Sequence, residues 1–199
     1  MQPPENFINE IKNLEQKFGK IFVFVDYGNV TKWFKDDIRD LEENRLLPSE
    51  KLVINIGKLA EFLDLFGREK FFYYGLDVKK IGSIVTIKKA WKYKFNVVSK
   101  NIQWIKINQA GDKIPKCNFD VEISIDIVKE KEKYDTVCLL SNDNDFSPLL
   151  EYVKNHNKKV ILISGKNTRR SLKEKANYSI NAQTIKSFIC SVKQKKDFT

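Results

Sequence analysis

Short, uninterrupted apolar runs limit the folds open to this chain more than any other feature of its sequence. The clearest is Ile21–Val25, which reads IFVFV, and comparable runs occur at Thr136–Leu140 and Lys159–Ile163. A strand that is apolar at every position is buried on both faces, as in a parallel sheet that helices cover on both sides. The sequence therefore predicts an α/β fold with a mostly parallel central sheet flanked by helices.

The remaining patterns alternate between strand and helix periodicity. Strands are expected at Ile21–Val25, Phe71–Tyr74, Phe95–Val98, Thr136–Leu140 and Lys159–Ile163, with an extra strand at Gln103–Ile107 and a polar loop from Asn108 to Lys116. Helices are expected within residues 7–18, 31–44, 81–91, 120–132 and 146–155, from an N-cap at Ser49 to Phe66, and from about Ala182. About five strands alternating with helices are typical of a doubly wound sheet. We predict one domain over residues 20–185, an N-terminal helix in residues 1–19 packed on it, and a basic C-terminal helix or tail in residues 186–199.

The chain carries 36 basic and 26 acidic residues, a formal net charge of +10. This excess predicts a polyanionic partner, with nucleic acid ahead of a membrane surface, although a lysine-rich proteome would produce the same excess. The three cysteines, Cys117, Cys138 and Cys190, share no metal-site spacing, so free thiols are expected. No run approaches ~20 apolar residues and the N-terminus does not read as a secretory signal, so we expect a cytoplasmic protein without a membrane partner.

Carboxylates follow two of the predicted strands at the point where each strand ends. Asp26 follows the first strand, and Asp143 and Asp145 follow Thr136–Leu140. Ligands of open α/β sheets lie beyond the carboxyl ends of the strands, so these side chains are expected to meet. Like charges brought together are costly unless a cation neutralises them, and Mg²⁺ or Mn²⁺ prefers carboxylate oxygens. Each residue singly also fits a helix cap or a turn, but their recurrence at two strand ends favours a metal site.

Three short motifs contain these acids or lie between them. They read FVDYGN at residues 24–29, KCNFDV at residues 116–121 with Asp126 following, and SNDNDF at residues 141–146. Together they resemble the NYN domain, in its LabA-like branch, within the PIN-like nuclease superfamily. The resemblance covers residues from about 20 to 185. The chain departs from it at Asn142 and Asn144, where many members of the family carry glycine.

The resemblance implies a three-layer PIN-like fold and a metal-dependent site of the endoribonuclease kind. Mg²⁺ or Mn²⁺ would be held by four acidic residues that are also the catalytic residues, with two polar residues in support: Asp26, Asp120, Asp143 and Asp145, then Asn29 and Ser141. RNA is expected ahead of DNA as the substrate.

The second motif leads into a predicted helix on which Asp120, Glu122 and Asp126 lie. Asp126 lies about 120° round this helix from Asp120, so both are not expected to touch one ion. We prefer Asp120 as the metal ligand, because it is nearer the helix N-terminus, and place Asp126 and Glu122 second, as a pair that supports the site or is solvated. Hydrolysis assisted by a metal needs no protein nucleophile. That fits a chain whose one histidine, His156, is expected in a polar surface turn.

Basic residues gather in two stretches of the chain. Residues 79–116 hold ten lysines against one acid, with aromatic residues interleaved, as in proteins that bind single strands. Trp91 and Phe95 fit core positions better than exposed ones. For Trp104 the sequence pattern does not decide between core and surface. The second stretch, from residue 166 to the end, includes the loop after the last predicted strand. Nucleic-acid contacts are expected at Lys116, Lys166, Arg169, Arg170 and Trp104, and the sequence leaves a homodimer open.

Other functions remain to be weighed against the nuclease. A weakly catalytic RNA-binding regulatory module would keep the same acids as a structural ion site. A phosphatase of the haloacid dehalogenase type needs a second acid two residues after Asp26, where this chain has Gly28. A dinucleotide-binding domain needs a glycine-rich motif after the first strand, and the sequence has none there. The module is therefore the alternative that stays open.

Overall fold

A computed structural model of the chain describes residues 5–106 and 113–195. Its centre is a six-stranded sheet in the order β4-β3-β1-β7-β8-β9, and every neighbouring pair is parallel. The strands are β1 (Ile21–Asp26), β3 (Gly67–Leu76), β4 (Asn96–Asn101), β7 (Thr136–Leu140), β8 (Lys159–Ser164) and β9 (Tyr178–Asn181). The predicted parallel sheet is thereby confirmed. The prediction of about five strands omitted β9, because YSIN is short and largely polar.

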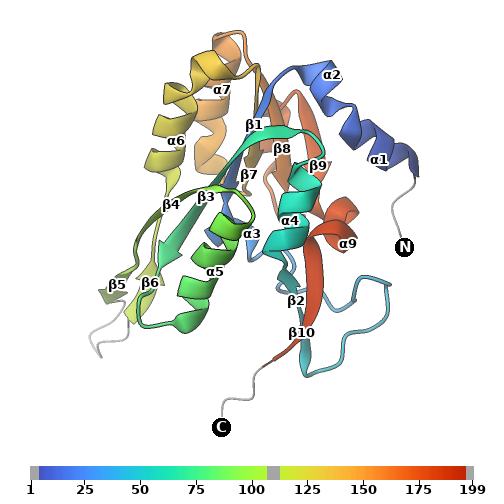
Figure 1. Ribbon diagram of the computed structural model, residues 1–199, viewed down its shortest axis with the longest axis vertical. Coiled ribbons are helices and arrows are strands. Elements are labelled where there is room, and N and C mark those ends of the chain that lie inside the picture. Colours follow the sequence, from blue (N-terminus) through green and yellow to red (C-terminus); the bar gives the residue numbers. More distant parts are fainter. Residues whose placement is uncertain (1–4, 107–112, 196–199) are drawn as a thin grey trace.

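Helices cover both faces of this sheet, giving three layers (Figure 1). One face is covered by α4 (Ile56–Leu63), α5 (Ile81–Lys92) and α9 (Lys186–Ile189), and the other by α6 (Asp120–Lys129), α7 (Ser147–Asn155) and α8 (Arg170–Lys175). Alternate residues of β1 point to opposite faces, so Val23 and Val25 join one core cluster while Phe22 and Phe24 join the other. Burial of both faces accounts for the uninterrupted apolar runs.

The N-terminal segment forms two short helices, α1 (Glu5–Lys12) and α2 (Leu14–Phe18), rather than one. Ile11, Leu14 and Phe18 are buried in the same cluster as α4, so the segment packs on the core. Across the residues that the structure describes, no helix has the length and apolar content required to cross a bilayer. All three cysteines are free thiols, as expected.

The helix predicted at residues 31–44 is wrong. This stretch forms turns and an isolated antiparallel bridge between Arg39 and Arg45. The Asp40 carboxylate accepts hydrogen bonds from the backbone N–H groups of Glu42 and Asn44, at 2.8 and 2.9 Å. Such bonds compete with the helical ladder, which explains the failure of the prediction.

The helix predicted from Ser49 to Phe66 is wrong in its first third. Residues Glu50–Ile54 form strand β2, which pairs antiparallel with β10 (Cys190–Gln194), and the cap of α4 is Asn55 rather than Ser49. The predicted C-terminal helix is likewise replaced by a 3-10 turn (η3, Ala182–Ile185), α9 and β10. Two segments far apart in the sequence stabilise each other here, and local periodicity does not show such pairing.

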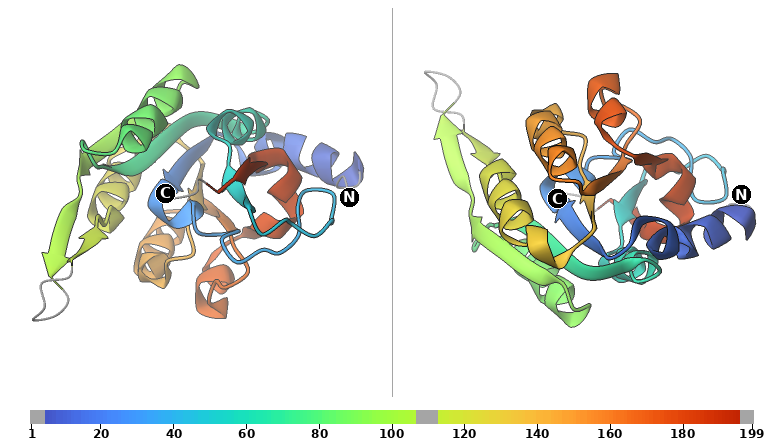
Figure 2. Two further views of the ribbon diagram at one scale, coloured as in Figure 1. Left: turned by 90° about the horizontal axis from the view of Figure 1, so that it is seen from below. Right: turned by 90° about the horizontal axis from the view of Figure 1, so that it is seen from above.

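A second small sheet lies beyond the edge strand β4. It is an antiparallel hairpin of β5 (Gln103–Lys106) and β6 (Lys113–Lys116), and it extends away from the body of the molecule in both views of Figure 2. The extra strand predicted at Gln103–Ile107 is confirmed as far as Lys106. The loop predicted at residues 108–116 is wrong for 113–116, which form β6, and residues 107–112 lie outside the described part of the chain.

Candidate metal centre

The order of the central sheet reverses at β1. From β1 the chain proceeds through β3 to β4 on one side, then returns to β7, β8 and β9 on the other. Ligands of parallel α/β sheets bind beyond the carboxyl ends of the strands at such a reversal. Asp26 is the last residue of β1, and Asp143 and Asp145 follow the end of β7. The fold thus places the acids of two strand ends at its switch point.

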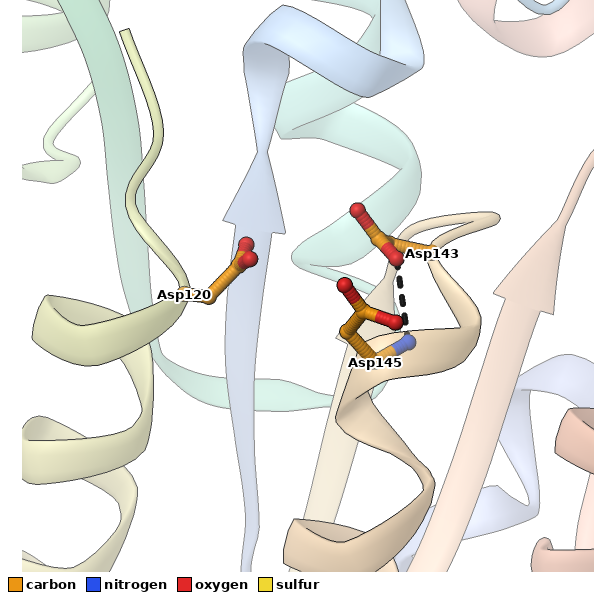
Figure 3. A group of neighbouring side chains, drawn as sticks. All are labelled: Asp120, Asp143 and Asp145. Atoms are coloured by element: carbon orange, nitrogen blue, oxygen red, sulfur yellow. Dashed lines mark hydrogen bonds between the residues drawn. The ribbon is translucent and has the colours of Figure 1, made fainter.

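Three carboxylates converge at this point. Asp120, Asp143 and Asp145 each offer one oxygen, and these three oxygens lie within 4.8 Å of one another. In Figure 3, Asp120 at the start of α6 faces the other two across the end of β1. The backbone N–H of Asp145 donates to Asp143 Oδ1 at 3.0 Å, so Asp143 caps the short 3-10 turn η2 (Asn144–Phe146) while it faces Asp120. Asp143 therefore both caps η2 and belongs to the three-carboxylate group.

Asp26 lies beside this group and lines the same pocket of about 430 Å³ as Asp120 and Asp143. Its carboxylate accepts a hydrogen bond from Ser141 Oγ at 3.0 Å and from the Asn29 backbone N–H at 3.2 Å. Burial raises the pKa of Asp26 to about 6, and the negative charges of Asp120 and Asp143 add to the rise, while the two hydrogen bonds oppose it. The ionised form of Asp26 is thus disfavoured in the metal-free site.

The Asp120 carboxylate is likewise partly buried and close to other acidic groups. Burial raises its pKa, the Asn118 side chain opposes the rise with a hydrogen bond of 2.8 Å, and Asp143 and Asp145 raise the pKa further. A divalent cation among these oxygens would remove the repulsion. Two oxygens bound to one Mg²⁺ lie at most about 4.2 Å apart, which is twice the usual bond length. Small side-chain rotations would close the present spacing, so the residues fit a hard cation such as Mg²⁺ or Mn²⁺.

Polar side chains tie the loops of the site together. Asn29 Oδ1 accepts hydrogen bonds from Trp33 Nε1 at 3.2 Å and from the Asn142 backbone N–H at 3.0 Å, which joins the loop after β1 to the loop after β7. The Asn142 side chain in turn accepts from the Gly165 backbone N–H at 2.6 Å and from Thr168 Oγ1 at 2.9 Å. Ser141 Oγ links Asp26 to the Asp143 backbone N–H.

Sequence reasoning missed the linking role of Asn142. The available signal was its departure from glycine within an acidic loop, which reads as a weakness of the resemblance rather than as a structural link. Lys32 and Cys117 also line the pocket without having been singled out for it. Lys32 lies six residues after Asp26 on the loop that closes the pocket, a spacing that carries no recognisable signal by itself.

The other acids of α6 face elsewhere. The Tyr73 hydroxyl donates to Asp126 Oδ2 at 2.7 Å, and the Glu122 carboxylate forms an ion pair with Lys100. The structure therefore brings Asp120, and not Asp126, into the three-carboxylate group. Asp126 instead joins α6 to β3, so Asp126 and Glu122 do not form the pair that the sequence suggested.

The predicted nucleic-acid contacts divide into different environments. Lys116 lines the acid pocket and Trp104 is 47% exposed on the hairpin, while Arg169 is exposed at the start of α8. Lys166 Nζ pairs with Asp37 at 3.0 Å, and Arg170 pairs with Glu174 at 2.7 Å. Lys166 and Arg170 would therefore have to release these carboxylates before either could bind a phosphate.

The core assignment of the two aromatic residues near α5 is half right. Phe95 is buried, as expected, but Trp91 is 60% exposed, which overturns its placement in the core. Ile87 and Ala90 are the buried apolar residues of this helix, and Trp91 lies outside the buried face. His156 is exposed at the end of α7, as expected for a surface turn.

Comparison with known proteins gives one family and one fold. Residues 20–185 match the sequence profile of the family described as NYN domain. A solved structure of a protein of unknown function from Vibrio parahaemolyticus is similar with a TM-score of 0.59 and 20% sequence identity, covering 81% of this chain and 91% of that one. At this identity the likeness shows the fold alone. No curated protein matches the chain.

Proposed function

The chain belongs to the NYN domain family, and from that premise we propose that it is a metal-dependent nuclease that hydrolyses phosphodiester bonds. The family lies within the PIN-like nuclease superfamily. RNA ahead of DNA as the substrate, cleavage within a strand, and the LabA-like branch are parts of the same proposal. The proposal also includes Mg²⁺ or Mn²⁺ as the bound metal.

The observation that carries this proposal is the convergence of Asp120, Asp143 and Asp145 within 4.8 Å beside the half-buried Asp26. These acids come from three separate segments of the chain. Two of them, Asp26 and Asp120, have pKa values raised by burial and by neighbouring carboxylates. A protein without a cation at this point would carry that cost for no gain in packing.

A bound Mg²⁺ or Mn²⁺ would supply Lewis-acid stabilisation of phosphate charge and lower the pKa of a water molecule. The chain's own residues fix where this occurs. Ser141 and Asn29 hold the Asp26 carboxylate in one orientation, and the Asp145 backbone N–H holds that of Asp143. No serine–histidine pair is at hand, since the one histidine lies exposed at the end of α7.

Cations around the pocket are suited to holding the phosphates of the substrate. Lys32 and Lys116 line it together with Asp26 and Asp120. Arg169 is the N-cap of α8, and Ser171 in the first turn of that helix donates from its hydroxyl to Asn144 Oδ1 in the acidic loop at 2.7 Å. A polyanion lying across the acids would therefore meet positive charge on both sides of them.

An assay of cleavage tests the proposal directly. Labelled single-stranded RNA and DNA are incubated with the purified protein and Mn²⁺, Mg²⁺ or a chelator. We expect metal-dependent cleavage that falls at least ~100-fold in Asp143→Asn and in Asp145→Asn, because each removes one charged ligand. Glu132→Gln is the matched control, since Glu132 is a highly exposed acid on a 3-10 turn after α6.

The same assay weighs the remaining alternative, a binding module that keeps the acids as a structural ion site. Binding of RNA by the unmutated protein without any cleavage in either metal would favour that module. Equal cleavage by the protein and both aspartate variants would show that a contaminating nuclease is responsible and would refute the assigned site.

A further inference from the structure

The β5–β6 hairpin leads directly into the acid pocket. Its last residue, Lys116, and the two residues that follow, Cys117 and Asn118, line the pocket that contains Asp26 and Asp120. Pro115 lines the pocket as well. The hairpin thus provides one wall of the pocket at its base and extends from there beyond the sheet (Figure 2).

Trp104 lies on the face of the hairpin that adjoins this wall. It is paired with Pro115 across the two strands, and directly opposed residues of an antiparallel pair share a face. Lys113 is two residues from Pro115 on the same strand, so it belongs to that face too. Trp104 is 47% exposed and Lys113 is exposed. The indole of Trp104 and the ring of Pro115 therefore lie opposite each other, and the ammonium group of Lys113 follows further from the pocket on the same face.

A second ammonium group borders the indole. Lys80 Nζ lies 5.4 Å from the centroid of the Trp104 ring and 3.7 Å from Asp77 Oδ2. Asp77 and the ring hold this lysine beside Trp104, although the lysine itself is 65% exposed. A half-exposed aromatic ring flanked by cations matches the chemistry of nucleic-acid strands, whose unpaired bases stack on aromatic rings while lysines neutralise the phosphates.

We propose that Trp104, with Pro115, Lys80 and Lys113, forms a base-stacking subsite that holds an unpaired nucleotide of the strand whose phosphate lies at the acids. This subsite rests on the proposed function, since it takes the acid pocket as the place where the backbone is cleaved. It requires an unpaired base next to the cleaved position, because a base within a duplex presents no free face to the indole.

The subsite can be tested by measuring RNA binding under conditions in which no cleavage occurs. Fluorescence anisotropy with a labelled oligouridylate of twelve nucleotides is measured in a chelator, for the unmutated protein and for Trp104→Ala. We expect an affinity about 5- to 100-fold weaker in the variant, as for loss of one base stack. Trp104→Phe should recover most of the loss. Trp91→Ala is the matched control, because Trp91 is exposed on α5 outside the hairpin and should bind within about twofold of the unmutated protein.

A second measurement does not depend on how Trp104→Ala folds. In Trp91→Phe the two remaining tryptophans are Trp104 and the buried Trp33. Oligouridylate stacked on the Trp104 indole should therefore quench the fluorescence of Trp104. Absence of quenching at saturating oligonucleotide, unchanged affinity in Trp104→Ala, or an equal loss in Trp91→Ala would each overturn the subsite.

Cleavage by the same proteins separates the two proposals. If the unmutated protein cleaves RNA and Trp104→Ala binds it equally well, the nuclease stands and the subsite is wrong. If the unmutated protein cleaves nothing but Trp104→Ala loses affinity selectively, stacking on the hairpin is supported and the nuclease is wrong.

Discussion

At the scale of single residues, ionisation of Asp26 lowers the stability of the folded protein. Its pKa of about 6 in the folded chain lies above the usual 3.8, so folding favours the protonated form. Stability from this group is therefore fully present below pH 4 and is lost as the pH rises through 6. At pH 7 without metal the folded protein contains a half-buried, ionised carboxylate that its acidic neighbours repel.

Asp26→Asn should accordingly stabilise the metal-free protein at pH 7. The shift corresponds to at most about 3 kcal/mol, and we expect a gain of about 1–2 kcal/mol because the amide bonds less well than the carboxylate to Ser141 and Asn29. Urea unfolding in a chelator at pH 7 and pH 4 measures it. The gain should vanish at pH 4, and a gain of equal size at both pH values would contradict this account.

Asn142 is a second residue whose role is local and measurable. Its side chain is the acceptor for the backbone N–H of Gly165, a buried residue, so Asn142→Ala leaves that group without its partner. We expect a loss of about 1–3 kcal/mol in the free energy of unfolding. Asn144→Ala is the control, because its partner Ser171 is exposed and can bond to water instead. Similar losses in both variants would show that Asn142 does not join the two loops.

At the scale of elements, what the sequence predicted depends on where each element finds its partners. β7 was predicted with both ends correct and β1 to within one residue, because a strand buried on both faces must be apolar throughout. β2, β9 and β10 were missed, since they are short and are stabilised by segments far away in the chain. Strand ends also located Asp26, Asp143 and Asp145, whereas Asp120 required the resemblance to a family.

Helix α6 carries two acids whose different directions can be tested. Asp120→Asn should weaken binding of Mn²⁺ at least about 10-fold, because Asp120 belongs to the three-carboxylate group. Asp126→Asn should leave the affinity nearly unchanged and instead cost about 1 kcal/mol of stability, since it weakens the hydrogen bond from Tyr73. Titration calorimetry with Mn²⁺ and urea unfolding distinguish the two. A larger loss of Mn²⁺ affinity in Asp126→Asn than in Asp120→Asn would reverse the assignment.

At the scale of the whole molecule, the acids come from parts of the chain that are far apart in the sequence. Asp26 ends β1, Asp120 begins α6, and Asp143 and Asp145 follow β7. These segments belong to the sheet and to the helical layer on one of its faces. An ion shared by them would act as a crosslink that forms only in the folded state, because the unfolded chain holds the acids far apart.

Such an ion should raise the stability of the entire domain. A ligand at 100 times its dissociation constant stabilises by about 2.7 kcal/mol, which for a chain of this size raises the unfolding temperature by roughly 5–10 °C. Differential scanning calorimetry with increasing Mn²⁺ measures the rise, with Asp143→Asn as the variant that should lose it and Glu132→Gln as the one that should keep it. A rise that persists in Asp143→Asn would therefore place the ion outside the acid pocket and remove the basis for a metal centre there.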